Sequence, residues 1–126
     1  MILLDTSVLV ESLAGDRVSL ARLRRVLDTG EPILLPALVL YEWWRGSRTV
    51  EEIIDQEKLF PSAAALPFGH NEAALAAKLY RDAPRARSRE IDIAIAACAI
   101  VHEAALWTLN RGDFKDIPGL ALANPV

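Results

Sequence analysis

The sequence has few of the residues that build disulfide frameworks and zinc sites. Its 126 residues include one cysteine, Cys98, and two histidines. A single cysteine excludes an intramolecular disulfide framework, and a structural zinc site would need a cluster of cysteine and histidine ligands. A lone thiol in an apolar segment is typical of proteins from reducing compartments, so we expect a cytoplasmic location.

Long hydrophobic runs are also missing. The chain is 52% hydrophobic and 25% charged, which is typical of a folded globular protein. Two prolines break the stretch PILLPALVLY at residues 32–41, and no run reaches the roughly 18 apolar residues of a membrane span. The N-terminus has no basic region before an apolar stretch, so a signal peptide is not expected. At this length we predict one domain, residues 1–126.

Lysine is scarce compared with arginine. The net charge of −3 argues against a protein that coats nucleic acid through charge alone. Of the 14 basic residues, 11 are arginines, the side chain suited to bidentate contacts with phosphate. Four of these arginines lie in RDAPRARSRE, residues 81–90. This segment is open to two interpretations, a solvated loop or a phosphate-binding rim.

Short apolar segments alternate with helical patterns along the chain. The alternation predicts a mainly parallel sheet of four to five strands between helices, a three-layer α/β/α sandwich. Ligands of such sheets bind at the edge where the carboxyl ends of the strands meet. The predicted strands are 1–4, 32–35, 63–68, 105–109 and 120–123, and the predicted helices are 7–15, 16–28, 37–46, 49–58, 71–82 and 90–103. Thr49 and Glu52 resemble a capping box at the start of one helix.

Four acidic residues interrupt apolar segments. Asp5 follows the first predicted strand, Glu42 lies in ALVLYEWW, Asp92 lies between two isoleucines, and Asp113 follows the fourth strand in TLNRGDF. Each has an ordinary explanation as a turn residue, an N-cap or a partner of the helix dipole, although a Glu with apolar neighbours on both sides fits this least.

Taken together, the four acids predict a metal site. Carboxylates that converge at one sheet edge repel one another unless a cation neutralises them. A set of oxygen ligands without cysteine or paired histidines favours Mg²⁺ or Mn²⁺, as one or two ions. Such a site suits hydrolysis of a phosphodiester by an activated water, with arginines positioning the phosphate strand.

The ordered set of motifs resembles that of a PIN domain. The motifs are DTS at residues 5–7, Glu42 followed by Arg45-Gly46, Asp92 opening an Ile/Ala-rich helix, and TLNRGDF at 108–114. The resemblance extends over the whole chain. More narrowly, the chain is similar to the VapC ribonuclease toxins of type II toxin–antitoxin systems.

The resemblance implies a Mg²⁺- or Mn²⁺-dependent endoribonuclease that cleaves a structured RNA such as a tRNA or ribosomal RNA. It also implies a homodimer and a cognate VapB-like antitoxin. Asp5, Asp92 and Asp113 would bind metal, and Glu42 would bind metal or orient the attacking water. Thr6, Ser7 and Asn110 match supporting polar positions, and the predicted RNA-phosphate contacts are Arg85, Arg87, Arg89 and Arg111.

Three other function classes compete with this interpretation. A receiver-type signalling domain needs a phosphate-accepting Asp behind the third strand, where AAALPFGH has none. A haloacid-dehalogenase-like phosphatase needs a second Asp where Ser7 stands. A catalytically silent RNA- or partner-binding module stays open as the alternative, although such a module gains nothing from four converging carboxylates.

The tryptophan pair and the histidines carry weaker signals. We expect Trp43 and Trp44 to divide between the core and an oligomer interface, with base stacking as the alternative. His70 and His102 are too isolated in the sequence for a metal pair or a catalytic pair.

Overall fold

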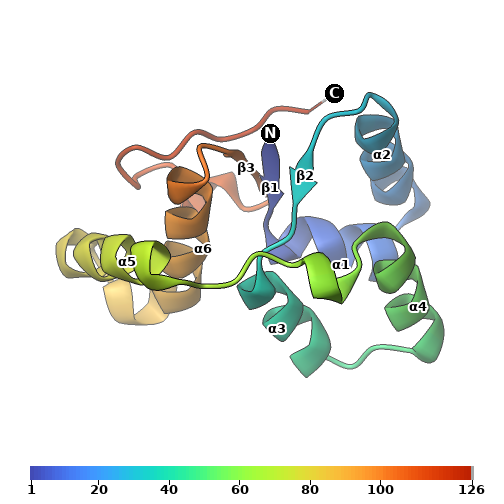
Figure 1. Cartoon of the computed structure of the whole chain (residues 1–126), viewed down its shortest axis with the longest axis horizontal. Coiled ribbons are helices and arrows are strands. Elements are labelled where there is room, and N and C mark those ends of the chain that lie inside the picture. The colour runs from blue at the N-terminus through green and yellow to red at the C-terminus, as the bar shows by residue number, and fades with distance from the viewer. Residues whose placement is uncertain (126) are drawn as a thin grey trace.

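Three short strands form a parallel sheet at the centre of the protein, as seen in a computed structural model that describes residues 1–125 (Figure 1). They are β1 (Ile2–Leu4), β2 (Ile33–Leu34) and β3 (Ala105–Trp107), in the order β2-β1-β3. β1 is the central strand, and all three of its residues are buried. A strand covered on both faces is apolar throughout, which is why ILL has no alternation.

Six helices surround this sheet. In Figure 1, α5 and α6 lie on one side of the strands, α2 and α4 lie on the other, and α1 and α3 lie toward the carboxyl ends. The predicted α/β character and the parallel sheet are confirmed. The helices are α1 (Thr6–Ala14), α2 (Arg17–Asp28), α3 (Ala37–Arg45), α4 (Val50–Leu59), α5 (His70–Asp82) and α6 (Glu90–Val101), with 3₁₀ turns at Ser62–Ala64, Ala86–Arg89 and Arg111–Asp113.

Two predicted strands are reduced to single bridges, so the prediction of four to five strands was wrong for the described residues. Leu66 pairs in parallel with Pro36, and Leu122 pairs in parallel with Leu106. The 3₁₀ turn Ser62–Ala64 ends just before the first bridge, and α3 begins directly after Pro36, so helical backbone limits this ladder. After the second bridge the next donor would be the backbone N–H of residue 125, which is a proline and has none.

The helix α6 is apolar on nearly every side. Six of its residues are buried, among them Ala96, Ala97 and Ala99 with no exposed surface. The helix ends at Val101, where Glu103 adopts a left-handed conformation (φ 53°) and Ala104 N–H donates to Ala99 O at 2.9 Å. This Schellman arrangement turns the chain into β3 two residues before the predicted helix end. With 12 residues α6 is too short to cross a membrane, and no other helix within residues 1–125 is long and apolar enough.

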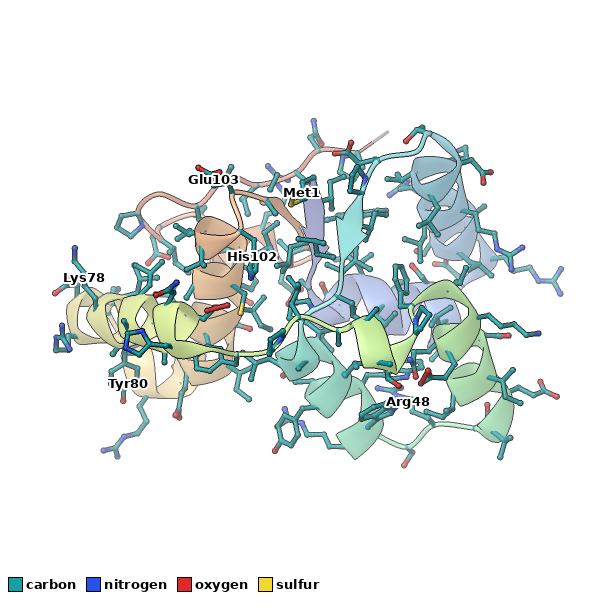
Figure 2. The ribbon with its side chains drawn as sticks, viewed as in Figure 1. Met1, Arg48, Lys78, Tyr80, His102 and Glu103 are labelled. Atoms are coloured by element: carbon teal, nitrogen blue, oxygen red, sulfur yellow. The ribbon has the colours of Figure 1, made fainter. Side chains whose placement is uncertain are left out.

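The start of α4 confirms the predicted capping box. Glu52 N–H donates to Thr49 Oγ1 at 3.1 Å, and Thr49 N–H donates to Glu52 Oε1 at 2.8 Å. Just before it, the Arg48 guanidinium lies over the Trp43 ring, 4.2 Å from the ring centroid, and Arg48 Nε donates to Trp43 O at 2.9 Å (Figure 2). These contacts fix the loop between α3 and α4. Trp43 is fully buried, as predicted for one member of the tryptophan pair.

A carboxylate–imidazole pair joins α5 and α6 away from the sheet edge. Glu72, in the first turn of α5, is buried, and its Oε2 lies 3.3 Å from His102 Nε2 at the end of α6 (Figure 2). Sequence reasoning left His102 isolated because its partner is 30 residues away. The pair tethers the two helices that pack beside β3.

Candidate active site

The strands β1 and β3 end side by side, and polar residues follow both. Leu4 pairs with Trp107, the last residue of β3. Asp5 and Thr108 come next, and Asp5 N–H donates to Trp107 O at 2.9 Å. Both side chains are buried, with 4% of Asp5 and 3% of Thr108 exposed. The parallel register therefore brings together two residues that lie 103 positions apart.

The Asp5 carboxylate is held by two hydroxyl groups. Ser7 Oγ donates to Asp5 Oδ2 at 2.8 Å, and Thr108 Oγ1 donates to the same oxygen at 2.7 Å. Each hydroxyl accepts a backbone N–H in turn, from Leu109 at 3.0 Å and from Asn110 at 3.0 Å. Within residues 1–125, Oδ1 of Asp5 accepts no hydrogen bond. One oxygen thus fixes the orientation of the carboxylate, and the other is left for a ligand.

The alternative explanation of Asp5 as a helix cap does not hold. Asp5 occupies the N-cap position of α1, but its side chain makes no capping hydrogen bond. Asp16 shows what a capping aspartate does in this protein, because its Oδ1 accepts Ser19 N–H at the start of α2 at 2.7 Å. A buried carboxylate that does not serve its helix points to a binding role.

Glu42 approaches the same edge from α3. Thr6 Oγ1, at the start of α1, donates to Glu42 Oε1 at 2.5 Å. Arg45 Nη2, one helical turn further along α3, lies 3.2 Å from Glu42 Oε2. The Glu42 side chain is 18% exposed, whereas Arg45 is 52% exposed. The neighbouring helix α1 therefore explains why a glutamate lies within the apolar sequence ALVLYEWW.

An open pocket of about 430 Å³ lies where these residues meet. Six of its lining residues were predicted as site residues: Asp5, Thr6, Ser7, Glu42, Asp92 and Asn110. Asp113 does not line it. The complete lining is Asp5, Thr6, Ser7, Val10, Glu11, Glu42, Asp92, Leu109 and Asn110.

Asp92 reaches the pocket from the first turn of α6. Burial first, and then the negative charges of Asp5, Glu42 and Asp113, together raise the pKa of its carboxyl from 3.8 to about 6. A carboxylate destabilised by its neighbours in this way is a usual feature of a cation site or a catalytic site. The four predicted acids are therefore near enough to interact through their charges.

The acids line the pocket without forming a closed ligand cluster. Within residues 1–125, no three side chains of His, Cys, Asp or Glu are grouped closely enough to hold a metal ion. The donor set nonetheless fits a hard divalent cation, because it consists of carboxylates whose mutual repulsion such an ion would relieve.

Asp113 is the outlying member of the four. It ends the 3₁₀ turn Arg111–Asp113 and is exposed to solvent. Its backbone N–H donates to Asn110 O at 2.9 Å, and its own carbonyl accepts Arg89 Nη2 at 2.9 Å. Its carboxylate is thus close to the acidic pocket but outside its lining.

The four arginines predicted to contact RNA phosphate differ in exposure and in their hydrogen-bond partners. Arg85 and Arg87 are exposed, as a phosphate-binding role requires. Arg89, also predicted as a phosphate contact, is instead 8% exposed and bound to Asp116, because burial of a guanidinium demands partners for its donors. Arg111 is exposed but donates through Nη1 to Ala123 O at 2.8 Å, which anchors the C-terminal segment.

Two residues of the site were missed by sequence reasoning. Thr108 opens the TLNRGDF motif, and a hydroxyl directly after β3 could have been matched to Asp5 directly after β1. Glu11 lies four residues after Ser7 on α1, so helical spacing places both on one face toward the pocket.

Comparisons with known proteins agree with this architecture. The family model of the PIN domain matches residues 2–120. The ribonuclease VapC19 of Mycobacterium tuberculosis is 31% identical over 123 residues, which cover 95% of this chain and 97% of that protein. At this identity and coverage the two chains are related over nearly their whole length.

Two solved structures share the fold. The VapBC2 complex of Rickettsia felis, bound to a DNA fragment from its promoter, superposes with a TM-score of 0.75 at 21% identity, covering 98% of both chains. A toxin–antitoxin complex from Klebsiella pneumoniae gives a TM-score of 0.75 at 20% identity, covering 100% of this chain and 98% of that one. At these identities the likeness is one of fold. Together with the family match, these findings place the chain in the PIN domain family, as a homologue of VapC-type ribonucleases.

Proposed function

We propose that this protein is a divalent-metal-dependent endoribonuclease, the toxin of a VapBC-type pair, which hydrolyses RNA phosphodiester bonds with an activated water. The observation that carries the proposal is the environment of Asp5. Its carboxylate is buried, Ser7 and Thr108 hold one of its two oxygens, and Asp5 lines the pocket together with Glu42 and Asp92. Membership of the PIN domain family and identity to a VapC ribonuclease support the same activity.

Each acid has a proposed role. Asp5 and Asp92 hold the ion within the pocket, and Asp113 approaches from its turn to complete the set. Glu42, between Thr6 and Arg45, binds the ion or orients the attacking water. A bound Mg²⁺ or Mn²⁺, as one or two ions, supplies a water of lowered pKa and neutralises charge on the phosphate.

The polar residues around the acids position them and the RNA. Ser7 and Thr6 hold Asp5 and Glu42, and Asn110 is exposed beside the pocket, available to the substrate phosphate. Arg85, Arg87 and Arg111 are proposed contacts to flanking phosphates, because exposed guanidinium groups fix the register of a polyanion. A structured RNA such as a tRNA or ribosomal RNA in the cytoplasm is the proposed substrate.

A VapB-like antitoxin is the proposed regulatory partner. The solved structures that share this fold include toxin–antitoxin complexes, and the acidic pocket is open enough to admit a segment of another chain. Co-expression with the product of an adjacent gene, followed by purification through a tag on one partner, tests this. A complex without RNA cleavage is the expected result.

A homodimer is proposed through an apolar groove that shares no lining residue with the acidic pocket. The groove has a volume of about 430 Å³ and lies between α5, α6 and the start of α3. Phe68 and Tyr80 line it and are each 39% exposed, and Ile91 completes its apolar wall. Light scattering of the wild type and of Phe68→Glu checks this, with a dimer expected only for the wild type.

Cleavage of total cellular RNA by the purified protein tests the activity itself. The reaction is run with Mg²⁺, with Mn²⁺ and with EDTA, beside the folded variants Asp5→Asn and Asp92→Asn. Asp55→Asn, an exposed acid on α4, is the matched control. Discrete, metal-dependent products that disappear only in the site variants are expected. Binding of RNA without cleavage in any metal would favour a catalytically silent module instead.

A further inference from the structure

The buried cation Arg89 links the helix that carries Asp92 to the turn that carries Asp113. It occupies the N-cap position of α6, three residues before Asp92, and its side chain crosses to the segment that carries Asp113. A cation at a helix N-terminus opposes the helix dipole, so α6 itself gains nothing from it. The reason for its position must lie in its partners.

Arg89 makes four hydrogen bonds to two separate segments. Its Nη1 and Nη2 donate to Asp116 Oδ2 at 3.0 Å and Oδ1 at 2.6 Å, a bidentate ion pair. Nη2 also donates to the backbone carbonyl of Asp113 at 2.9 Å, and Nη1 to that of Pro84 at 3.3 Å. The guanidinium thereby joins the loop after α5, the start of α6 and the turn that carries Asp113.

The bond from Arg89 Nη2 to the carbonyl of Asp113 links the Asp113 backbone directly to the start of α6. The Asp113 side chain makes no hydrogen bond within residues 1–125, and its turn is exposed. The planar Arg89 guanidinium is bound to both carboxylate oxygens of Asp116 and to the backbone carbonyl of Asp113, so it has little rotational freedom. It therefore fixes the Asp113 backbone relative to α6.

We propose that Arg89 and Asp116 form a clamp that sets the distance between Asp92 and Asp113, and thereby the affinity of the site for its divalent ion. Both are positioning residues, since neither lines the acidic pocket. This inference rests on the proposed metal-dependent nuclease and assigns to the sequence RSRE…DFKD a role separate from RNA binding.

The test measures Mn²⁺ binding by electron paramagnetic resonance in metal-stripped protein, without RNA. Arg89→Gln is expected to raise the Mn²⁺ dissociation constant about 10- to 100-fold, the usual loss when a residue that orients a metal ligand is removed. Asp116→Asn raises it less, because the amide keeps one acceptor oxygen for the guanidinium. Arg81→Gln, an exposed arginine on α5, leaves it unchanged.

A conservative variant separates geometry from charge. Arg89→Lys keeps the positive charge but not the planar fork, so Mn²⁺ affinity is expected to stay low. Wild-type affinity in Arg89→Lys would show that the planar guanidinium is not needed, and would overturn the clamp. In cleavage assays the Mn²⁺ concentration for half-maximal rate should rise in Arg89→Gln, while KM for RNA stays the same.

The outcomes distinguish the clamp from the proposed function. If the wild type binds Mn²⁺ and cleaves RNA, and folded Arg89→Gln does both equally well, only the clamp is wrong. If the wild type neither binds Mn²⁺ nor cleaves, both proposals are wrong. Should Arg89→Gln fail to fold, Asp116→Asn decides, because Asp116 is 45% exposed and its loss leaves the core intact. Wild-type Mn²⁺ affinity in folded Asp116→Asn overturns the clamp.

Discussion

The two halves of the acidic site are built differently. Asp5 is buried at the end of the central strand, and its carboxylate is fixed by Ser7 and Thr108. Asp113 is exposed on a short turn, and its backbone is held to the rest of the site by Arg89. The first half is rigid because a sheet ladder and side-chain hydrogen bonds position the same residue. The second is held by the backbone hydrogen bond from Asp113 N–H to Asn110 O and by Arg89, which is itself fixed by its ion pair with Asp116.

This difference fits the separate roles that we propose for the acids. A rigid carboxylate with one free oxygen is suited to hold an ion in a fixed place. A carboxylate on an exposed turn can adjust to the ion and to the substrate that approaches from solvent. Asp92 lies between them, with its pKa raised by burial and by the charges of its neighbours.

The largest effect is expected from Asp5→Asn, which removes charge from the rigid half. The amide oxygen can still accept from Ser7 and Thr108, so the fold should be retained. Loss of the charge that we propose to bind the metal removes several kcal/mol of transition-state stabilisation, so the cleavage rate should fall at least ~100-fold. Initial rates on RNA check this, with Asp55→Asn as the control; a variant that retains full activity would exclude Asp5 from the site.

Thr108→Val should weaken the rigid half without changing its charge. Asp5 Oδ2 loses one donor and Asn110 N–H loses its acceptor, so the free energy of unfolding should fall by about 1–3 kcal/mol. Activity should fall about 10- to 100-fold as Asp5 loses orientation. Denaturant unfolding and initial rates measure the two effects. Thr49→Ala serves as a stability control: it loses the α4 cap, at about 1 kcal/mol, and should keep its activity.

The environment of Asp92 is tested by measuring the free energy of unfolding against pH in the presence of EDTA. The folded-state pKa of Asp92 is raised from 3.8 to about 6, so the folded protein binds the proton more tightly than the unfolded chain. Relative to Asp92→Asn, the wild type should therefore lose stability as pH rises from about 4 to 7, by about 1–2 kcal/mol after allowance for solvent screening. Asp92→Asn should lack this loss. Equal pH dependence in both proteins would contradict the raised pKa.

The smallest effect is expected at the exposed rim. Arg45→Gln removes a salt bridge to Glu42 whose cation is half exposed to solvent. Such pairs contribute little, so the free energy of unfolding should change by less than about 0.5 kcal/mol. Thermal or denaturant unfolding measures it. A loss above 1 kcal/mol would mean that Glu42 is positioned as firmly as Asp5, and that the comparison between the two halves is too simple.

Much of the fold follows from local patterns in the sequence. Residues 2–4, apolar without alternation, predict a strand buried on both faces, and Thr49 with Glu52 predicts the start of α4. The predicted strands around Leu66 and Leu122 were overestimated because apolar content alone does not extend a ladder. Helical backbone adjoins the first bridge, and Pro125 removes a donor after the second.

The candidate site was predictable as a set of acids but not as a geometry. Asp5, Glu42 and Asp92 stand out because each interrupts an apolar segment, and the structure gathers them at one pocket. Arg89 shows the limit of this approach: in the sequence it is one arginine among four near residue 85, but in the structure it alone of the predicted phosphate contacts is buried. Its partners lie 24 and 27 residues away.

The sequence by itself determined the alternation of strands and helices and singled out the acids, three of which line the candidate site. These features depend on residue type and on spacing within single segments. The tertiary structure decided that Thr108 orients Asp5, that Thr6 accounts for Glu42, and that Arg89 holds Asp113 instead of meeting solvent. The reason is that hydrogen bonds between side chains of distant segments exist only once the parallel register has brought those segments together.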